Sequence, residues 1–254
     1  MISAAIPHSP DTLEQRRCKL LVRVHRHYRT TTSRVNLTPV AFDFTRIANP
    51  DAVLDQVAAE EDRRERQRGR RLAEGELHLP YWAELWDSAL GIGQYLVRRG
   101  DEIARPVSVL DLGCGMGLAG TVAAALGHRV LFADLEPPAL LFASLNSLPW
   151  RDRARTRRVN WRTDDLRERF ELIIGADIVY EKAQWEHLDW FWRLHLAHDG
   201  IVLLGEPGRQ SGELFVAWIN ERGWELEETE EKVTTRPRPI RIFRLKQKSS
   251  PAMQ

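Results

Sequence analysis

The chain has 254 residues, 43% hydrophobic and 29% charged, which is typical of a globular protein with one large α/β domain and an extension. Its 37 basic and 36 acidic side chains give a net charge of +1, so no overall field favours nucleic acid or a membrane surface. No apolar run approaches the roughly 20 residues that span a bilayer, and residues 1–11 lack a signal-peptide pattern. The two cysteines, Cys18 and Cys114, predict neither a disulfide nor a metal site. We therefore expect a cytoplasmic protein that does not contact a membrane.

Residues 1–77 are expected to form an N-terminal extension to a main domain at residues 78–254. Residues 20–28 alternate apolar and polar side chains, and residues 34–44 are rich in β-branched and aromatic ones, so a β-hairpin appendage is predicted. Residues 52–74 predict a helix whose end is mostly Arg and Glu. We interpret this charged end as a solvated face with i,i+4 ion pairs, and a docking surface for a charged partner is the alternative.

From residue 107 the pattern alternates between strand and helix. Strands are expected at residues 107–112, 129–134, 155–161, 171–177 and 201–205. Helices are expected at residues 118–126, 138–148, 182–196 and 212–222. Right-handed crossovers then predict a mostly parallel sheet with helices on both faces. The last two strands, at residues 225–233 and 240–246, have no helix between them and should pair antiparallel.

A glycine-rich turn follows the first of these strands. Asp111 precedes Gly113, Gly115 and Gly117, which allow a sharp turn and a close approach to a ligand. Dinucleotide enzymes use a related G-x-G-x-x-G turn to hold a pyrophosphate. An acid two residues before the first glycine would repel a phosphate but attract a cation. S-adenosylmethionine, with a sulfonium and an ammonium and no phosphate, is therefore the predicted cofactor.

The second strand ends in Asp134, about twenty residues after the glycine turn. A carboxylate at this place can accept hydrogen bonds from both ribose hydroxyls of an adenosine. The alternatives are that Asp134 only caps the following helix, or that Glu136 shares the ribose role.

Trp161 follows the third expected strand and is a candidate wall for the adenine ring, with a core position as the alternative. Asp164 and Asp165 come next, and because they are adjacent, at most one should point inward to accept the adenine amino group.

The fourth strand ends in the segment Gly-Ala-Asp-Ile-Val-Tyr, which contains Asp177 and Tyr180. This strand end lies where a substrate meets a methyl donor, so both residues are candidates for catalysis or substrate positioning. Residues 78–89, ahead of the first strand, are rich in aromatic side chains and by themselves predict a hydrophobic clasp over the sheet.

Together these stretches resemble the seven-β-strand protein-lysine methyltransferases, methyltransferase family 16, which carry a D/E-x-x-Y/F signature. The matching motifs are LWDSA at 85–89, DLGCGMGL at 111–118, Asp134, Trp161 and GADIVY at 175–180. The likeness runs from about residue 78 to 222, whereas residues 1–77 match loosely and the acid pair after Trp161 departs from the pattern. The resemblance implies a Rossmann-like seven-stranded class I methyltransferase fold that binds S-adenosylmethionine. It assigns the cofactor contacts to Trp86, Gly113, Cys114, Gly115, Asp134, Trp161 and Ala176.

The same resemblance places Asp177 and Tyr180 at the methyl-transfer channel and implies a lysine of a protein substrate as acceptor. A lysine amine has a pKa of about 10.4 and must lose its proton first. Our hypothesis is that Asp177 and Tyr180 accept hydrogen bonds from the neutral amine.

Three other functions compete with this one. The first is a small-molecule N-methyltransferase for an amine or pyridine metabolite. The second is a non-catalytic cofactor-binding partner protein, against which the presence of both Asp177 and Tyr180 argues. Base methylation of nucleic acid is disfavoured, because the fourth strand lacks the Asn/Asp-Pro-Pro-Tyr/Phe motif that grips a flipped base. The basic residues 151–158 are interpreted as a solvated loop, with a binding patch as the alternative.

Overall fold

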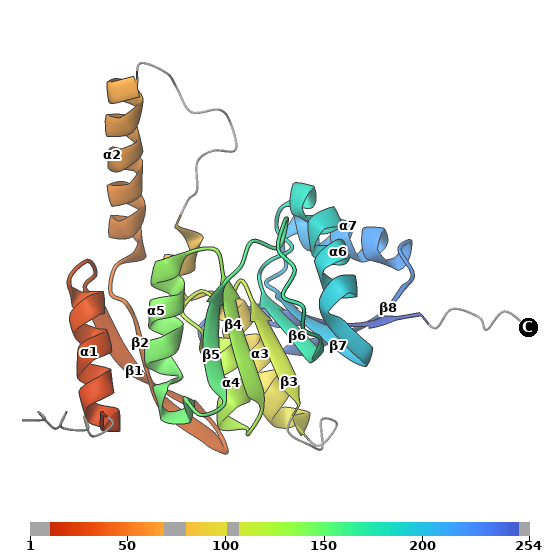
Figure 1. Cartoon of the computed structure of the whole chain (residues 1–254). Coiled ribbons are helices and arrows are strands. Elements are labelled where there is room, and N and C mark those ends of the chain that lie inside the picture. The colour runs from red at the N-terminus through yellow and green to blue at the C-terminus, as the bar shows by residue number, and fades with distance from the viewer. Residues whose placement is uncertain (1–10, 69–79, 101–106, 249–254) are drawn as a thin grey trace, which may run out of the picture.

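A seven-stranded sheet forms the centre of the computed structural model, which describes residues 11–68, 80–100 and 107–248 (Figure 1). Its strand order is β5-β4-β3-β6-β7-β9-β8. The strands are β3 (Ser108–Leu112), β4 (Arg129–Asp134), β5 (Ala154–Arg158), β6 (Phe170–Ala176), β7 (Leu196–Glu206), β8 (Trp224–Glu231) and β9 (Ile240–Gln247). Neighbouring strands are parallel except that β9 pairs antiparallel with both β7 and β8. The predicted α/β class and the antiparallel ending are confirmed.

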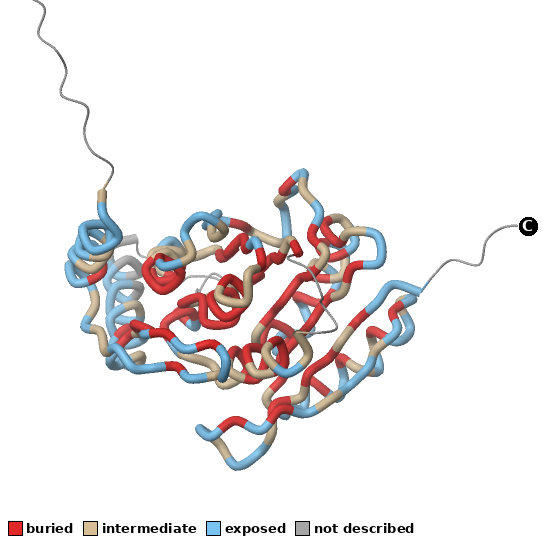
Figure 2. Tube along the Cα trace, turned by 90° about the horizontal axis from the view of Figure 1, so that it is seen from below, coloured by how far each residue is buried: buried red, intermediate tan, exposed pale blue. Residues whose placement is uncertain are grey.

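Helices cover both faces of this sheet. One face carries α3 (Asp87–Arg98), α4 (Leu118–Ala125) and α5 (Pro137–Asn146), and the other carries α6 (Trp185–His195) and α7 (Gln210–Asn220). Alternate side chains of each strand point to opposite faces, so Val109 belongs to the first core and Leu110 to the second. Figure 2 shows that buried residues run the length of the central strands. Burial on both faces explains why these strands are nearly continuous apolar runs.

Two expected elements of this domain are shorter in the structure. β5 ends at Arg158 and not at Trp161, because Trp161 lies in a turn. The helix expected at residues 182–196 is a single 3-10 turn, Lys182–Gln184, followed by α6. Among the described residues, no helix combines the length and apolar character needed to cross a membrane.

Residues 20–28 do not form the predicted strand. Most of them belong to α1 (Leu13–His25), which begins at a capping box formed by Thr12 and Gln15. Leu20, Leu21 and Val24 recur at helical spacing and pack into the first core, and α1 lies against α5. The short alternation of polar and apolar residues was ambiguous, and the capping signal and the helical face decided the structure.

The N-terminal hairpin exists, but it is built differently. Its strands are β1 (Thr30–Leu37) and β2 (Val40–Ile47), so the turn at Thr38-Pro39 lies inside the segment predicted to be one strand. Proline has no N–H for a strand ladder and favours a turn. The Asn146 amide of α5 links Thr45 of β2 to the Met116 carbonyl oxygen, so the hairpin supports the glycine turn.

The charged helix α2 (Pro50–Arg68) projects from the body in Figure 1. It begins close to the predicted start at residue 52. Residues 69–74 of the predicted helix, and the proposed domain boundary at residues 77 and 78, lie outside the described residues. The hairpin shares the first core with α4 and α5, since Phe42 and Phe44 are buried in the same cluster as Phe142.

Gly205 allows β7 to approach the start of α3 closely. A Cβ there would lie 2.7 Å from the Ser88 carbonyl oxygen and 3.1 Å from the Ser88 Cβ. We expect the Gly205→Ala variant to lower Tm by about 5 °C or more, because backbone atoms must move. Thermal unfolding checks this, with Gly100→Ala as control because a Cβ at Gly100 meets nothing within 4 Å. Equal Tm values for the two variants would contradict the close approach.

Candidate active site

The glycine turn at the carboxyl end of β3 adopts the backbone that only glycine favours. Gly113 and Gly115 have φ values of 64° and 51°, and Gly117, with φ of 83°, is the N-cap of α4. The Cys114 N–H donates to the Ala133 carbonyl oxygen at 3.0 Å, which ties the turn to β4. Burial raises the pKa of the Cys114 thiol well above its ordinary value, so this sulfur is a packing group and no nucleophile.

Asp111 is buried beneath the first turn of α4. One of its carboxylate oxygens accepts a hydrogen bond from the Gly120 N–H at 2.9 Å. Burial raises its pKa to about 7, against the lowering effect of that hydrogen bond, and the Asp134 charge adds to the rise. Its part in cofactor binding stays a prediction, and the Gly120 contact is a structural role.

The raised pKa of Asp111 predicts a pH dependence of stability. The folded chain keeps a proton on this group that the unfolded chain releases from pH 3.8 upward. Its contribution is therefore complete below that pH and is lost as the pH rises through about 7. Between about pH 5 and pH 8, the free energy of unfolding of wild type should fall about 2–3 kcal/mol more than that of Asp111→Asn, which cannot ionise. Urea unfolding across this range measures both, and identical pH slopes would contradict the prediction.

Asp134, at the end of β4, holds the backbone of two turns. Its carboxylate accepts hydrogen bonds from the N–H groups of Gly115 and Glu136, each at 2.9 Å. Burial raises its pKa, and these two hydrogen bonds oppose the rise. Both oxygens keep further lone pairs, since a carboxylate offers about four acceptor sites. The alternative that Asp134 serves the start of the next helix is compatible with the Glu136 contact.

Trp161 stands beside the glycine turn. A Cβ on Gly113 would lie 3.4 Å from its ring, so the indole and the turn face each other directly. The indole N–H donates to the Gln184 side-chain oxygen at 3.1 Å, which fixes the ring orientation. Trp161 is half-buried and packs on the second core, and its role as a wall for the adenine ring stays a prediction.

The two acidic residues after Trp161 accept hydrogen bonds from backbone N–H groups of their own loop. The Asp164 carboxylate accepts from the Asn160 N–H at 2.9 Å, and the Asp165 carboxylate accepts from the Arg167 N–H at 2.7 Å. Asp165 is exposed, whereas Asp164 is half-buried. Neither contact bears on which of the two residues reaches an adenine amino group.

Asp177 directly follows β6 and has an uncommon backbone for a residue other than glycine, with φ of 55°. Its side chain is 3% exposed and forms a bidentate ion pair with Arg209, with distances of 2.9 Å to Nε and 2.6 Å to an Nη atom. Its N–H donates to the Gly205 carbonyl oxygen of β7. The pKa of the Arg209 guanidinium is raised chiefly by its hydrogen bonds to this carboxylate.

Tyr180 lies three residues further on and packs edge to face on Tyr81, with ring centroids 5.7 Å apart. Burial raises its pKa to about 12, and the nearby Glu181 charge adds to the rise. The phenol is therefore neutral at physiological pH, so it can accept or donate a hydrogen bond but cannot act as a charged base.

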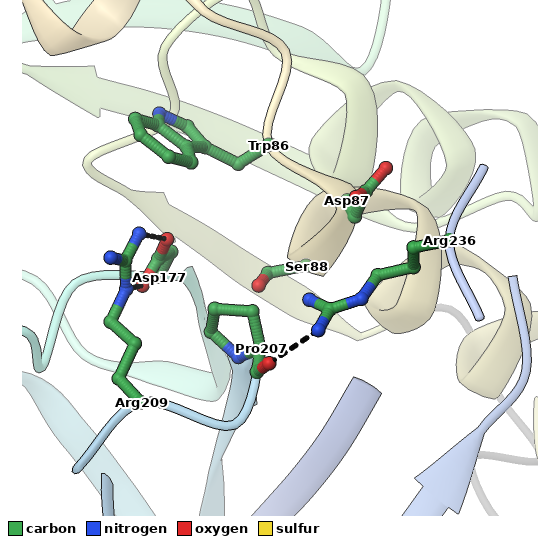
Figure 3. Close-up of a pocket in the computed structure, with 7 residues that line it drawn as sticks. All are labelled: Trp86, Asp87, Ser88, Asp177, Pro207, Arg209 and Arg236. Carbon is green, nitrogen blue, oxygen red and sulfur yellow. Dashed lines mark hydrogen bonds and ion pairs between the residues drawn. The ribbon is translucent and has the colours of Figure 1, made fainter. Parts of the chain in front are cut away.

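A cavity of ≈ 290 Å³ opens between α3 and the ends of β6 and β7 (Figure 3). Its lining residues are Trp86, Asp87, Ser88, Asp177, Pro207, Arg209 and Arg236. The Trp86 indole donates to the Tyr81 carbonyl oxygen at 3.0 Å, and its ring lies 5.4 Å from the Arg209 guanidinium carbon. A carboxylate and an aromatic face thus surround a cation.

Sequence reasoning missed Arg209 and Arg236. Arg209 ends the motif Gly-Glu-Pro-Gly-Arg, which begins in the last two residues of β7, and strand-end loops of neighbouring parallel strands meet at one sheet edge. That position was a usable signal. Arg236 lies in the connection between the two antiparallel strands β8 and β9, where no local pattern marks a role.

The structure brings most of the predicted site residues to one edge. Ile178 packs against Gly113, since a Cβ there would lie 3.0 Å from an Ile178 methyl group, and this joins the glycine turn to the Asp177 segment. Ala176 is the last residue of β6, immediately before Asp177. Residues predicted to bind the cofactor are therefore neighbours of those predicted to serve methyl transfer.

The residues present fit S-adenosylmethionine. The positive φ values of Gly113 and Gly115 favour glycine, and a Cβ on Gly113 would lie 3.0 Å from an Ile178 methyl group. Carboxylates and aromatic faces near this turn suit a sulfonium, an ammonium and an adenine ring. Among the described residues, no group of three His, Cys, Asp or Glu side chains gathers as metal ligands do.

Named lysine methyltransferases match about half of the chain. An electron transfer flavoprotein beta subunit lysine methyltransferase of Danio rerio is 30% identical over 136 residues, which cover 51% of this chain and 51% of that protein. Protein N-lysine methyltransferase METTL21A of Xenopus tropicalis is 35% identical over 129 residues, covering 48% of this chain and 58% of the relative. The chain thus spans about half the length of the curated relatives that it matches.

Solved structures support the fold. The glycopeptide N-methyltransferase MtfA, complexed with S-adenosylmethionine, superposes with a TM-score of 0.53 at 16% identity, covering 61% of this chain and 93% of MtfA. The seven-stranded class I methyltransferase fold is therefore confirmed. A family model described as lysine methyltransferase matches residues 78–220, more than half of the sequence. The chain belongs to this lysine methyltransferase family.

Proposed function

We propose that this protein transfers methyl groups from S-adenosylmethionine to a lysine side chain of a protein substrate. The observation that carries the proposal is a cavity lined by both Asp177 and Trp86, and the neighbour of Asp177, Ile178, packs on the glycine turn. Its size suits an extended aliphatic chain, and its carboxylate and aromatic groups suit an amine at the end of that chain. Family membership supports the same reaction.

Cofactor binding is assigned to the residues around the glycine turn. Gly113 and Gly115 offer backbone to the amino-acid end of the cofactor, Asp134 accepts from the ribose hydroxyls, and Trp161 stacks on the adenine. Trp86, Asp111, Cys114, Gly117 and Ala176 complete this set. S-adenosylmethionine supplies a methyl group that is already activated on a sulfonium.

The chain's own contribution to the reaction is positioning of the amine. Methyl transfer is an in-line displacement, so its rate depends on alignment of a neutral nitrogen with the methyl group. Asp177 has acceptor sites left after its two bonds to Arg209 and can hold the N–H groups of the amine. The Arg209 charge disfavours a second cation beside it and so helps a lysine to lose its proton.

Tyr180 would complete the amine site as a neutral hydrogen-bond partner. Its pKa of about 12 keeps the phenol protonated, so it orients the nitrogen and does not remove its proton. The proton leaves to solvent through the exposed side of Tyr180, which is 38% accessible.

The test is a labelling experiment with tritiated S-adenosylmethionine and a lysate of the source cells. We expect label in discrete protein bands that yields methyl-lysine on acid hydrolysis and is absent with Asp177→Asn. Label only in the small-molecule fraction would overturn the proposal in favour of a metabolite N-methyltransferase. Absence of label from both fractions, with normal S-adenosylmethionine binding, would favour a non-catalytic binding protein.

A further inference from the structure

We infer that Arg236, Ser88 and the first turn of α3 form a carboxylate subsite, which selects target lysines that have an Asp or Glu side chain beside them. This inference rests on the proposed function and names the class of substrate for the same cavity. Its residues lie on the wall opposite Asp177 and Arg209, in a part of the cavity that the amine does not need (Figure 3).

The Ser88 hydroxyl is the first sign of a missing ligand. Ser88 is 0% exposed, and its oxygen has no hydrogen-bond partner although it lines the cavity. In Figure 3 this oxygen is directed away from α3, toward the space between Asp177 and Pro207. A buried hydroxyl without a partner costs about 1–3 kcal/mol, so native proteins nearly always give it one. A ligand oxygen in the cavity would satisfy it.

Arg236 indicates that this ligand carries a negative charge. Its guanidinium donates to the Pro207 carbonyl oxygen at 2.7 Å, a contact that holds it at the cavity wall. Within residues 11–68, 80–100 and 107–248 it has no carboxylate partner, whereas the second cavity arginine, Arg209, forms an ion pair with Asp177. A half-buried guanidinium held next to an unpartnered hydroxyl matches a carboxylate, which accepts from both.

The nearby carboxylate of Asp87 does not neutralise the Arg236 guanidinium on the side that faces the cavity. The Asp87 carboxylate accepts from the Thr235 hydroxyl at 2.5 Å, and Figure 3 shows it directed away from Ser88. This hydrogen bond also fixes the β8–β9 connection, which carries Arg236, against the start of α3. Ser88 is the second residue of α3, where backbone N–H groups and the helix dipole favour a negative ligand.

The two ends of the cavity then match two groups of one substrate. A lysine amine would reach Asp177, and a carboxylate of a neighbouring side chain would reach Arg236 and Ser88. A lysine flanked only by basic residues would leave Arg236 and Ser88 without partners.

The test uses the full-length chain, tritiated S-adenosylmethionine and the source-cell lysate, with labelled lysines mapped by mass spectrometry. We expect the mapped lysines to have an Asp or Glu beside them. Arg236→Gln should lower the initial labelling rate about 10- to 100-fold, and raising the lysate concentration should recover it, because affinity and not turnover is lost. Arg236→Lys should keep part of the rate, and S-adenosylmethionine affinity should not change.

Two further variants separate recognition from folding. Ser88→Ala should lower the labelling rate while its Tm equals or exceeds that of wild type, because it removes a hydroxyl that has no partner. Arg238→Gln, in the same connection but outside the cavity lining, should label like wild type. Wild-type labelling rates for Arg236→Gln, or mapped lysines without acidic neighbours, would overturn the subsite and leave the proposed function standing. No protein label with wild type would overturn both.

Discussion

Replacement of Asp177 by asparagine is expected to lower the rate of methyl transfer roughly 100-fold or more and to leave the Kd for S-adenosylmethionine within about two-fold. Asparagine lacks the charge that holds Arg209 and can offer only one acceptor oxygen to an amine. The loss should therefore appear in turnover. Single-turnover labelling and calorimetric titration of the cofactor measure the two quantities separately.

Asparagine is the informative substitution because of the backbone at this position. Asp177 has a φ of 55°, which asparagine adopts more readily than alanine does. Alanine would add backbone strain to the loss of charge. Arg209 is 40% exposed, so it remains hydrated when its partner is lost, and the variant should fold.

Asp199→Asn is the matched control, because Asp199 also has a positive φ, 60°, and its exposed side chain pairs with His198 and belongs to no predicted site. It should keep wild-type turnover. If Asp177→Asn weakens cofactor binding as strongly as it slows turnover, Asp177 belongs to the cofactor site and the amine-positioning role is wrong.

Replacement of Asp134 by asparagine should produce the opposite pattern, a loss of S-adenosylmethionine affinity of about 10- to 100-fold. The asparagine amide group cannot accept from both the Gly115 N–H and the Glu136 N–H, so the glycine turn loosens where the cofactor binds. The asparagine side chain also has fewer acceptor sites for the ribose hydroxyls than a carboxylate has. Calorimetric titration with S-adenosylmethionine and with S-adenosylhomocysteine measures the effect.

Glu136→Gln distinguishes the two acids near the ribose position. Glu136 is half-buried two residues after Asp134, and its pairing with Asp134 uses only its backbone N–H. Loss of affinity in Glu136→Gln with normal affinity in Asp134→Asn would transfer the ribose role to Glu136. A change in Tm alone for Asp134→Asn would leave Asp134 as a structural residue.

The sequence by itself determined the main architecture, because the signals for it are local. Alternation of apolar strands and amphipathic helices from residue 107 predicted the mostly parallel sheet, and the absence of a helix between the last two strands predicted their antiparallel pairing. The glycine turn was readable because the positive φ values at Gly113 and Gly117 require glycine whatever the surroundings are.

The sequence pattern gave a wrong prediction where the same residues fitted both the strand period and the helix period. Residues 20–28 alternate over too few positions to exclude a helix, and what decided was a capping box upstream and an apolar face that packs on α5, more than a hundred residues away in sequence. A helix of this length gains most of its stability from such packing, so its own sequence does not decide it.

Only the tertiary structure decided which side chains of the site form ion pairs and hydrogen bonds with one another. Asp177 was visible as a strand-end acid, yet its bidentate partner Arg209 comes from the loop after the next strand, and Arg236 comes from a third connection. Strand order and register place these loops together, and a sequence pattern contains neither. Charged side chains take their partners from whatever the fold places within about 3 Å. Pairing, burial and the resulting pKa values are therefore properties of the assembled sheet edge and not of its segments.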